Sequence, residues 1–69
     1  MRYPPVKTLD AVAQGRIDYR ARRDATHFRH FFRTLDDQGN PSSDPQTIAR
    51  VELTQRGKDY YTQLNGRSR

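Results

Sequence analysis

Residues 25–37 read ATHFRHFFRTLDD and contain every phenylalanine of the 69-residue chain. The apolar positions of this stretch recur at i, i+3, i+4 and i+7, namely Phe28, Phe31, Phe32 and Leu35. That spacing is typical of one face of an α-helix. Asp24 precedes the stretch where an N-cap would lie, and Gly39 follows it where a helix can end. The pattern predicts a central helix over residues 25–37, against which the rest of the chain packs.

The opposite face of this predicted helix is polar and basic: Thr26, His27, Arg29, His30 and Arg33. Residues 16–33 hold six arginines and two acids, in a chain whose thirteen Lys and Arg against eight Asp and Glu give a net charge of +5. Eleven of the thirteen cations are arginine, which suits bidentate contact with phosphate and guanine. A solvated face is the plainer interpretation, but so basic a small domain favours nucleic-acid binding.

The segment before the central helix contains short elements. Residues 1–7 are expected to form an extended arm because two consecutive prolines disfavour helix there. Thr8 can cap a short helix over residues 9–14, which Gly15 would end. Residues 16–19 are ambiguous, because Ile17 and Tyr19 alternate as in a short strand while Asp18 can cap a second helix. One long helix over residues 18–35 and two helices broken near Asp24 fit the pattern equally well.

The segment after the central helix predicts a loop, a strand and a last helix. Residues 36–47 contain turn-forming residues and no apolar residue. Residues 48–53 alternate as a half-buried strand does. Thr54 can cap a helix over residues 55–64, and residues 67–69 are expected to form a basic tail.

Two stretches resemble the winged helix-turn-helix DNA-binding domains of the MarR type. Residues 28–39 contain a leucine, two acids and a glycine in the order found at the end of a recognition helix, and residues 51–61 contain the Leu-Thr-x-x-Gly motif that follows the wing. The resemblance implies an α+β fold over residues 8–66, a small winged helix-turn-helix with three to four helices and a short β-hairpin or reduced sheet. Because residues 40–45 are polar and broken by proline, the first wing strand is expected to be missing, displaced or very short.

The resemblance and the charge together predict sequence-specific binding of double-stranded DNA. The recognition helix is placed at about residues 25–37 and the wing at about residues 38–50, in a small transcriptional regulator or excisionase-like architectural factor. The polar face listed above is assigned to base or groove contact. The expected phosphate contacts are Arg20, Arg22, Arg23, Arg50, Arg56 and Lys58. The alternative is a protein-interaction module with the same fold, such as an anti-activator or polymerase-binding inhibitor, anchored by Phe or Tyr.

Other functions find little support in the sequence. The chain has no cysteine, no glycine-rich phosphate loop and no pair of carboxylates spaced for catalysis, so we expect neither an enzyme nor a cofactor. Asp24, His27 and His30 diverge around a helix, so we expect no metal site. Tyr60 and Tyr61 fit the core better than a base-stacking platform. We expect no membrane segment and a cytoplasmic or nucleoid-associated protein, and the hydrophobic fraction of 32% makes a homodimer possible.

Overall fold

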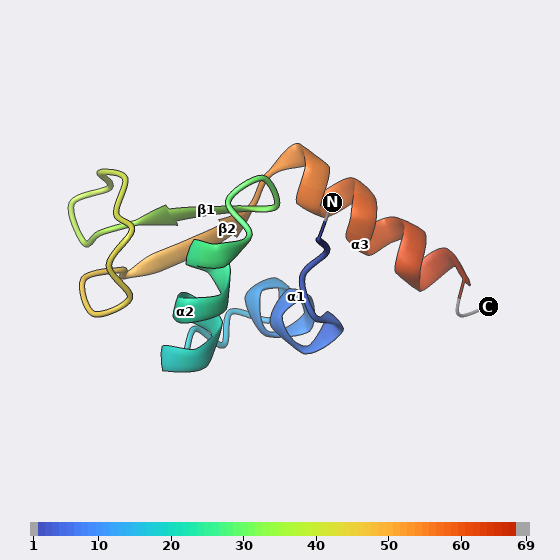
Figure 1. Ribbon diagram of the computed structural model, residues 1–69, viewed down its shortest axis with the longest axis horizontal. Coiled ribbons are helices and arrows are strands. Elements are labelled where there is room, and N and C mark those ends of the chain that lie inside the picture. Colours follow the sequence, from blue (N-terminus) through green and yellow to red (C-terminus); the bar gives the residue numbers. More distant parts are fainter. Residues whose placement is uncertain (1, 68–69) are drawn as a thin grey trace.

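The computed structural model describes residues 2–67, which form three helices and one two-stranded antiparallel sheet. In chain order the elements are α1 (Val6–Ala13), α2 (Tyr19–His27), β1 (Phe32–Leu35), β2 (Arg50–Leu53) and α3 (Gln55–Arg67). This is a small α+β fold consistent with a reduced winged helix, as predicted (Figure 1). No helix in the described part of the chain is long and apolar enough to span a membrane.

The predicted helix over residues 25–37 is wrong. α2 ends at His27, residues 29–31 form a turn, and β1 begins at Phe32. The backbone amides of Phe31 and Phe32 both donate to the carbonyl of Phe28, which reverses the chain there. Phe31 and Phe32 are buried as the helical pattern required, but from a turn and a strand. The apolar spacing therefore predicted the burial of Phe31 and Phe32 correctly and the secondary structure wrongly, and Phe28 and Leu35 are only half-buried.

Neither alternative for residues 18–35 is correct, although the Asp18 cap is. The Asp18 carboxylate accepts a hydrogen bond from the amide of Ala21 at 2.8 Å and so starts α2. Asp24, which was expected to be an N-cap, lies inside α2 and accepts a hydrogen bond from Thr8 Oγ1 at 3.0 Å. Thr8 was also expected to be a cap, but it is buried within α1. Their side chains instead join the two helices.

The ends of the domain also differ from prediction. α1 begins at Val6 with Pro5 at its N-cap, so the extended arm stops before residue 7, and Gly15 follows the helix with a φ of +78°. α3 continues past the predicted end at residue 64 and includes Arg67. Residues 68–69, the rest of the predicted basic tail, lie outside the described residues.

The hairpin takes its first strand from the predicted recognition helix. β1 and β2 pair antiparallel in the register Phe32↔Leu53, Arg33↔Glu52, Thr34↔Val51 and Leu35↔Arg50. The expected first wing strand is thus displaced and only four residues long. Residues 36–49 connect the strands, and Asp36 Oδ1 orders this loop by accepting the amides of Gln38 and Asn40, each at 2.9 Å. The wing consequently spans residues 32–53 rather than about 38–50.

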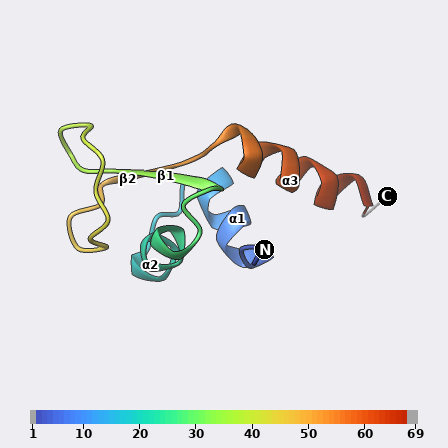
Figure 2. The ribbon, with the colours of Figure 1, turned by 45° about the horizontal axis from the view of Figure 1, so that its top comes forward.

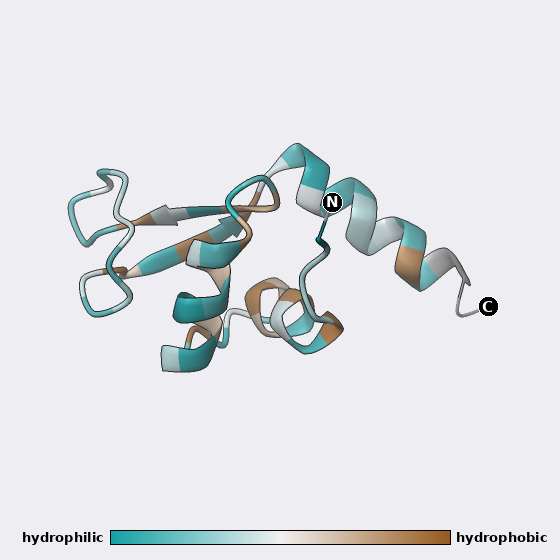
Figure 3. Ribbon diagram, viewed as in Figure 1, coloured by the Kyte–Doolittle hydropathy of each residue, from teal (hydrophilic) through white to brown (hydrophobic). Residues whose placement is uncertain are grey.

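The core lies where α1 and α2 meet one face of the sheet, as Figure 2 shows with the hairpin above both helices. Its buried residues come from both helices, the turn and the hairpin: Leu9, Val12, Ala25, Phe31, Phe32, Ile48 and Val51. Most residues of α2 and of the long loop between β1 and β2 are hydrophilic (Figure 3). The side of α2 away from this core is exposed to solvent.

α3 leaves the hairpin and runs outward beside the N-terminal segment (Figure 1). Thr54 Oγ1 accepts the amide of Gly57 at 3.2 Å, which confirms Thr54 as the cap of this helix. Gly57 lies so close to the turn that a Cβ there would collide with the carbonyl oxygen of Phe31. At the other side, the hydroxyl of Tyr61 donates to Asp10 Oδ1 at 2.8 Å. The close approach at Gly57 and the hydrogen bond from Tyr61 together hold α3 against the rest of the domain.

Candidate nucleic-acid interface

One face of α2 is exposed and basic. Its members are Tyr19, Arg20, Arg23 and His27, and we call them the α2 outer face. They share a side because α-helical residues three and four apart are neighbours. Ala21 and Ala25, on the opposite side, are 3% and 0% exposed and fix the helix on the core. Because these alanines are small, α2 packs closely against the core, and its longer side chains are exposed or half-buried.

Both acids of this segment are occupied by structural contacts. Asp18 caps α2, and Asp24 accepts the hydroxyl of Thr8 with its side chain only 17% exposed. Arg23 Nε lies 3.9 Å from Asp24 Oδ1, a long ion pair with an arginine side chain that is 54% exposed. Such an exposed pair contributes little, so Arg23 stays available to an anion. The outer face therefore presents positive charge with little compensation.

Two of the residues predicted to contact DNA, Arg22 and Thr26, also form contacts within the domain. The Arg22 guanidinium donates to the carbonyl of Ile17 at 3.3 Å and lies 5.9 Å from the centre of the Tyr19 ring. Its Nε is buried without a hydrogen-bond partner among the described residues. The Thr26 hydroxyl donates to the carbonyl of Arg23 at 2.6 Å. Both side chains are half-buried, so they are less suited to DNA contact than their exposed neighbours.

A second group of exposed cations follows α2 along the chain. Arg29 and His30 lie in the turn, and Arg33 points outward from β1 because its neighbours Phe32 and Thr34 face the core side. Thr54 Oγ1 donates to the carbonyl of His30 at 2.6 Å. This bond holds the turn against the start of α3, where Arg56 and Lys58 are exposed. The structure therefore brings residues 29–31 next to the N-terminal end of α3.

The loop of the hairpin is acidic. Residues 36–49 contain Asp36, Asp37 and Asp44 and no Lys or Arg, so the loop carries −3 and the rest of the +5 chain carries +8. Arg50, the one predicted contact within residues 38–50, pairs with Glu52 at 2.8 Å. The hairpin loop is thus acidic, whereas the α2 outer face is basic.

Sequence reasoning missed Tyr19 as a surface residue of this face. Its side chain is 51% exposed, which is unusual for a large ring. The signal was present, because an Asp18 cap with Ala21 and Ala25 inward fixes the phase of the helix and turns Tyr19 outward. The sequence left open whether Tyr19 belongs to a short strand with Ile17 or to a helix capped by Asp18, and only the helix turns Tyr19 outward beside Arg20 and Arg23.

A cleft also opens between α1 and α2, with a volume of about 370 Å³. Two alanines line it together with Lys7, Thr8, Asp10, Arg16, Asp18 and Arg20. Lys7 and Arg16 were not among the predicted site residues. Among the described residues no group of three His, Cys, Asp or Glu is placed to hold a metal ion.

The chain matches no protein-family model, and the searches of characterised proteins and solved structures found no significant match.

Proposed function

We propose that the protein binds double-stranded DNA with sequence preference by placing α2 in the major groove. The observation that carries this proposal is the α2 outer face, which exposes Arg20, Arg23 and His27 while two buried alanines hold the helix on the core. A basic helix held rigidly by its other face is what base readout requires, since loosely held side chains lose affinity on ordering.

The dimensions fit this role. Nine residues make a helix about 13 Å long, which spans roughly four base pairs, and the major groove is about 12 Å wide. Arginine recognises guanine through its two acceptors in that groove. Tyr19, at the first position of α2, offers an exposed ring edge for apolar contact with a thymine methyl group. Arg20 and Arg23 are the residues that we assign to base contact.

The phosphate contacts come from the turn, β1 and α3 rather than from the wing loop. Arg29, Arg33, Arg56 and Lys58 are exposed and form no ion pair within the described part of the chain. The loop over residues 36–49 carries three carboxylates, which the DNA backbone repels. We therefore expect the hairpin to lie across the backbone through Arg33 with its acidic loop directed away.

This role is that of a small transcriptional regulator or an excisionase-like architectural factor, without catalysis and in the cytoplasm or at the nucleoid. Its test compares two double variants that lose the same charge. Arg20→Gln/Arg23→Gln removes the assigned base contacts, and Arg56→Gln/Lys58→Gln removes assigned phosphate contacts. Fluorescence anisotropy is measured with a duplex that the wild-type protein selects from a random pool and with a scrambled duplex.

The first variant is expected to lose at least tenfold in affinity for the selected duplex and most of its preference over the scrambled one, since each base contact contributes about 1–3 kcal/mol. The second variant is expected to lose the same factor in affinity for both duplexes, and its affinity is expected to depend less steeply on salt concentration. Wild-type affinity and preference in Arg20→Gln/Arg23→Gln would refute the assignment of α2.

A protein partner is the second candidate, and one surface favours it. Tyr3 is 56% exposed and stacks on Tyr60 with ring centres 4.8 Å apart, beside a hollow of about 230 Å³ that Arg56 also lines. Exposed tyrosines are frequent anchors of protein interfaces, including those of homodimers. Binding through them would depend weakly on salt, whereas DNA binding weakens steeply as salt rises.

A further inference from the structure

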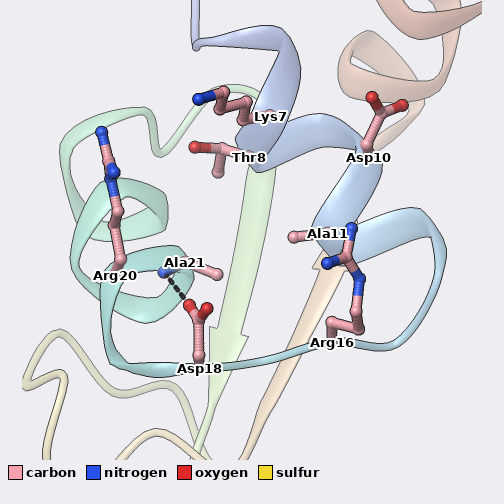
Figure 4. A pocket seen from close by; sticks show the side chains of 8 residues that line it. All are labelled: Lys7, Thr8, Asp10, Ala11, Arg16, Asp18, Arg20 and Ala21. Atoms are coloured by element: carbon pink, nitrogen blue, oxygen red, sulfur yellow. Dashed lines mark hydrogen bonds between the residues drawn. The ribbon is translucent and has the colours of Figure 1, made fainter.

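The cleft between α1 and α2 has three cations without internal partners. Lys7 comes from α1, Arg16 from the connection between the helices and Arg20 from α2. Their side chains form no hydrogen bond or ion pair within residues 2–67. Figure 4 shows Lys7 and Arg20 extending from the two helices at one end of the cleft and Arg16 standing across from them. The positive groups therefore surround the opening from three separate segments.

The two acids of the cleft are committed elsewhere. Asp18 accepts the amide of Ala21, the bond drawn in Figure 4, and Asp10 accepts the hydroxyl of Tyr61 from α3. Thr8, at the centre of the lining, donates its hydroxyl to Asp24. Both carboxylates keep their negative charge, so three cations against two acids leave the lining with a net charge of +1. The cleft is left with three free cationic donors and no free hydroxyl.

We propose that the α1–α2 cleft binds a phosphate group. Guanidinium donors match phosphate oxygens two at a time, and the ammonium of Lys7 adds a mobile point charge. A volume of about 370 Å³ is within the range of small-ligand sites, about 300–1,000 Å³, so it has room for the ester substituent as well as for the phosphate. The phosphate group comes either from a DNA backbone beside α2 or from a free phosphorylated molecule.

The site shares Arg20 with the proposed base contacts, whereas Lys7 and Arg16 lie outside the α2 outer face. The test therefore uses Lys7→Gln/Arg16→Gln in the full chain, with Arg56→Gln/Lys58→Gln as a control of equal charge loss. All four side chains are exposed, so folding is expected to be retained, and far-UV circular dichroism verifies it. Amide shifts are followed by NMR during titration with inorganic phosphate at constant ionic strength, with chloride in its place as a blank.

The expected result is saturable phosphate shifts at Lys7, Arg16 and Arg20 that chloride does not produce. Lys7→Gln/Arg16→Gln is expected to weaken phosphate binding at least tenfold, and the control variant less than twofold. Equal weakening in both variants, or shifts that do not saturate, would overturn the proposal by showing a general response to charge.

The titration is then repeated with a short duplex present. If the backbone supplies the phosphate, duplex and inorganic phosphate compete for the cleft, and Lys7→Gln/Arg16→Gln weakens duplex binding. If a free phosphorylated molecule is the ligand, the phosphate shifts persist on the duplex complex and the duplex affinity is unchanged. Either result supports a phosphate site. Saturable phosphate shifts in a protein that binds no duplex would refute the proposed function and leave the cleft site standing.

Discussion

Gly57 determines how closely α3 approaches the turn after α2. A Cβ at this position would collide with the carbonyl oxygen of Phe31 and would lie 3.1 Å from Leu53 Cδ2. The colliding atom belongs to the backbone and accepts the amide of Thr54 at 3.0 Å, so it cannot move away freely. The absence of one side chain thus permits the contact that joins the turn to α3.

Gly57→Ala is accordingly expected to destabilise the protein by about 1–3 kcal/mol, the usual cost of overpacking, although alanine favours helix. Urea unfolding followed by circular dichroism measures the change. Thr62→Ala, at an exposed position of the same helix, serves as the control and is expected to stay within about 0.5 kcal/mol of wild type. Equal stability of Gly57→Ala and wild type would mean that α3 does not approach Phe31 this closely.

At the scale of elements, the features that sequence predicted well depend on local chemistry. The cap at Thr54 was predicted correctly, because Thr54 and the Gly57 amide that it accepts lie within one turn of each other. The helix predicted across Phe28–Leu35 was wrong because the apolar spacing of these residues also suits a turn and a strand. β1 forms through pairing with Arg50–Leu53, after a loop of fourteen residues that the helical pattern did not include. The basic outer face of α2 was unpredictable in detail because residues 16–19 fit a short strand as well as a helix capped by Asp18.

The contact between α1 and α3 gives a prediction for alkaline pH. The hydrogen bond from Tyr61 to the Asp10 carboxylate raises the pKa of Tyr61 above its ordinary value of 10.0, with burial and the negative charge of Asp10 adding to the effect. The folded protein therefore keeps this proton at a pH where the unfolded chain releases it. The bond contributes its full stabilisation while the pH is below the ordinary pKa of tyrosine. This stabilisation is lost as the pH rises through that value and toward the higher pKa of the folded state.

Tyr61→Phe is expected to lower the urea midpoint near neutral pH and to flatten its decline between about pH 9 and 11. Tyr60→Phe keeps the bond to Asp10 and is expected to retain the wild-type slope. If Tyr61→Phe shows the same alkaline decline as wild type, the bond does not couple Tyr61 ionisation to folding.

At the scale of the whole molecule, charge is divided between two regions. The loop over residues 36–49 carries −3 and the remaining chain +8, and α2 presents Arg20 and Arg23 away from the core. In a winged helix with this distribution the helix would attract DNA and the wing loop would be repelled. The proposed mode of binding therefore depends on α2, with the hairpin contributing through Arg33 near its base.

An NMR titration of the isotopically labelled protein with duplex DNA, first at low and then at moderate salt, tests this claim most directly. We predict salt-sensitive amide shifts over Tyr19–His27 and at Arg29, His30 and Arg33, with the loop over residues 37–46 unchanged. Shifts confined to that loop or to the surface of Tyr3 and Tyr60, or no shifts at low salt, would contradict the account of α2 as a DNA-binding helix.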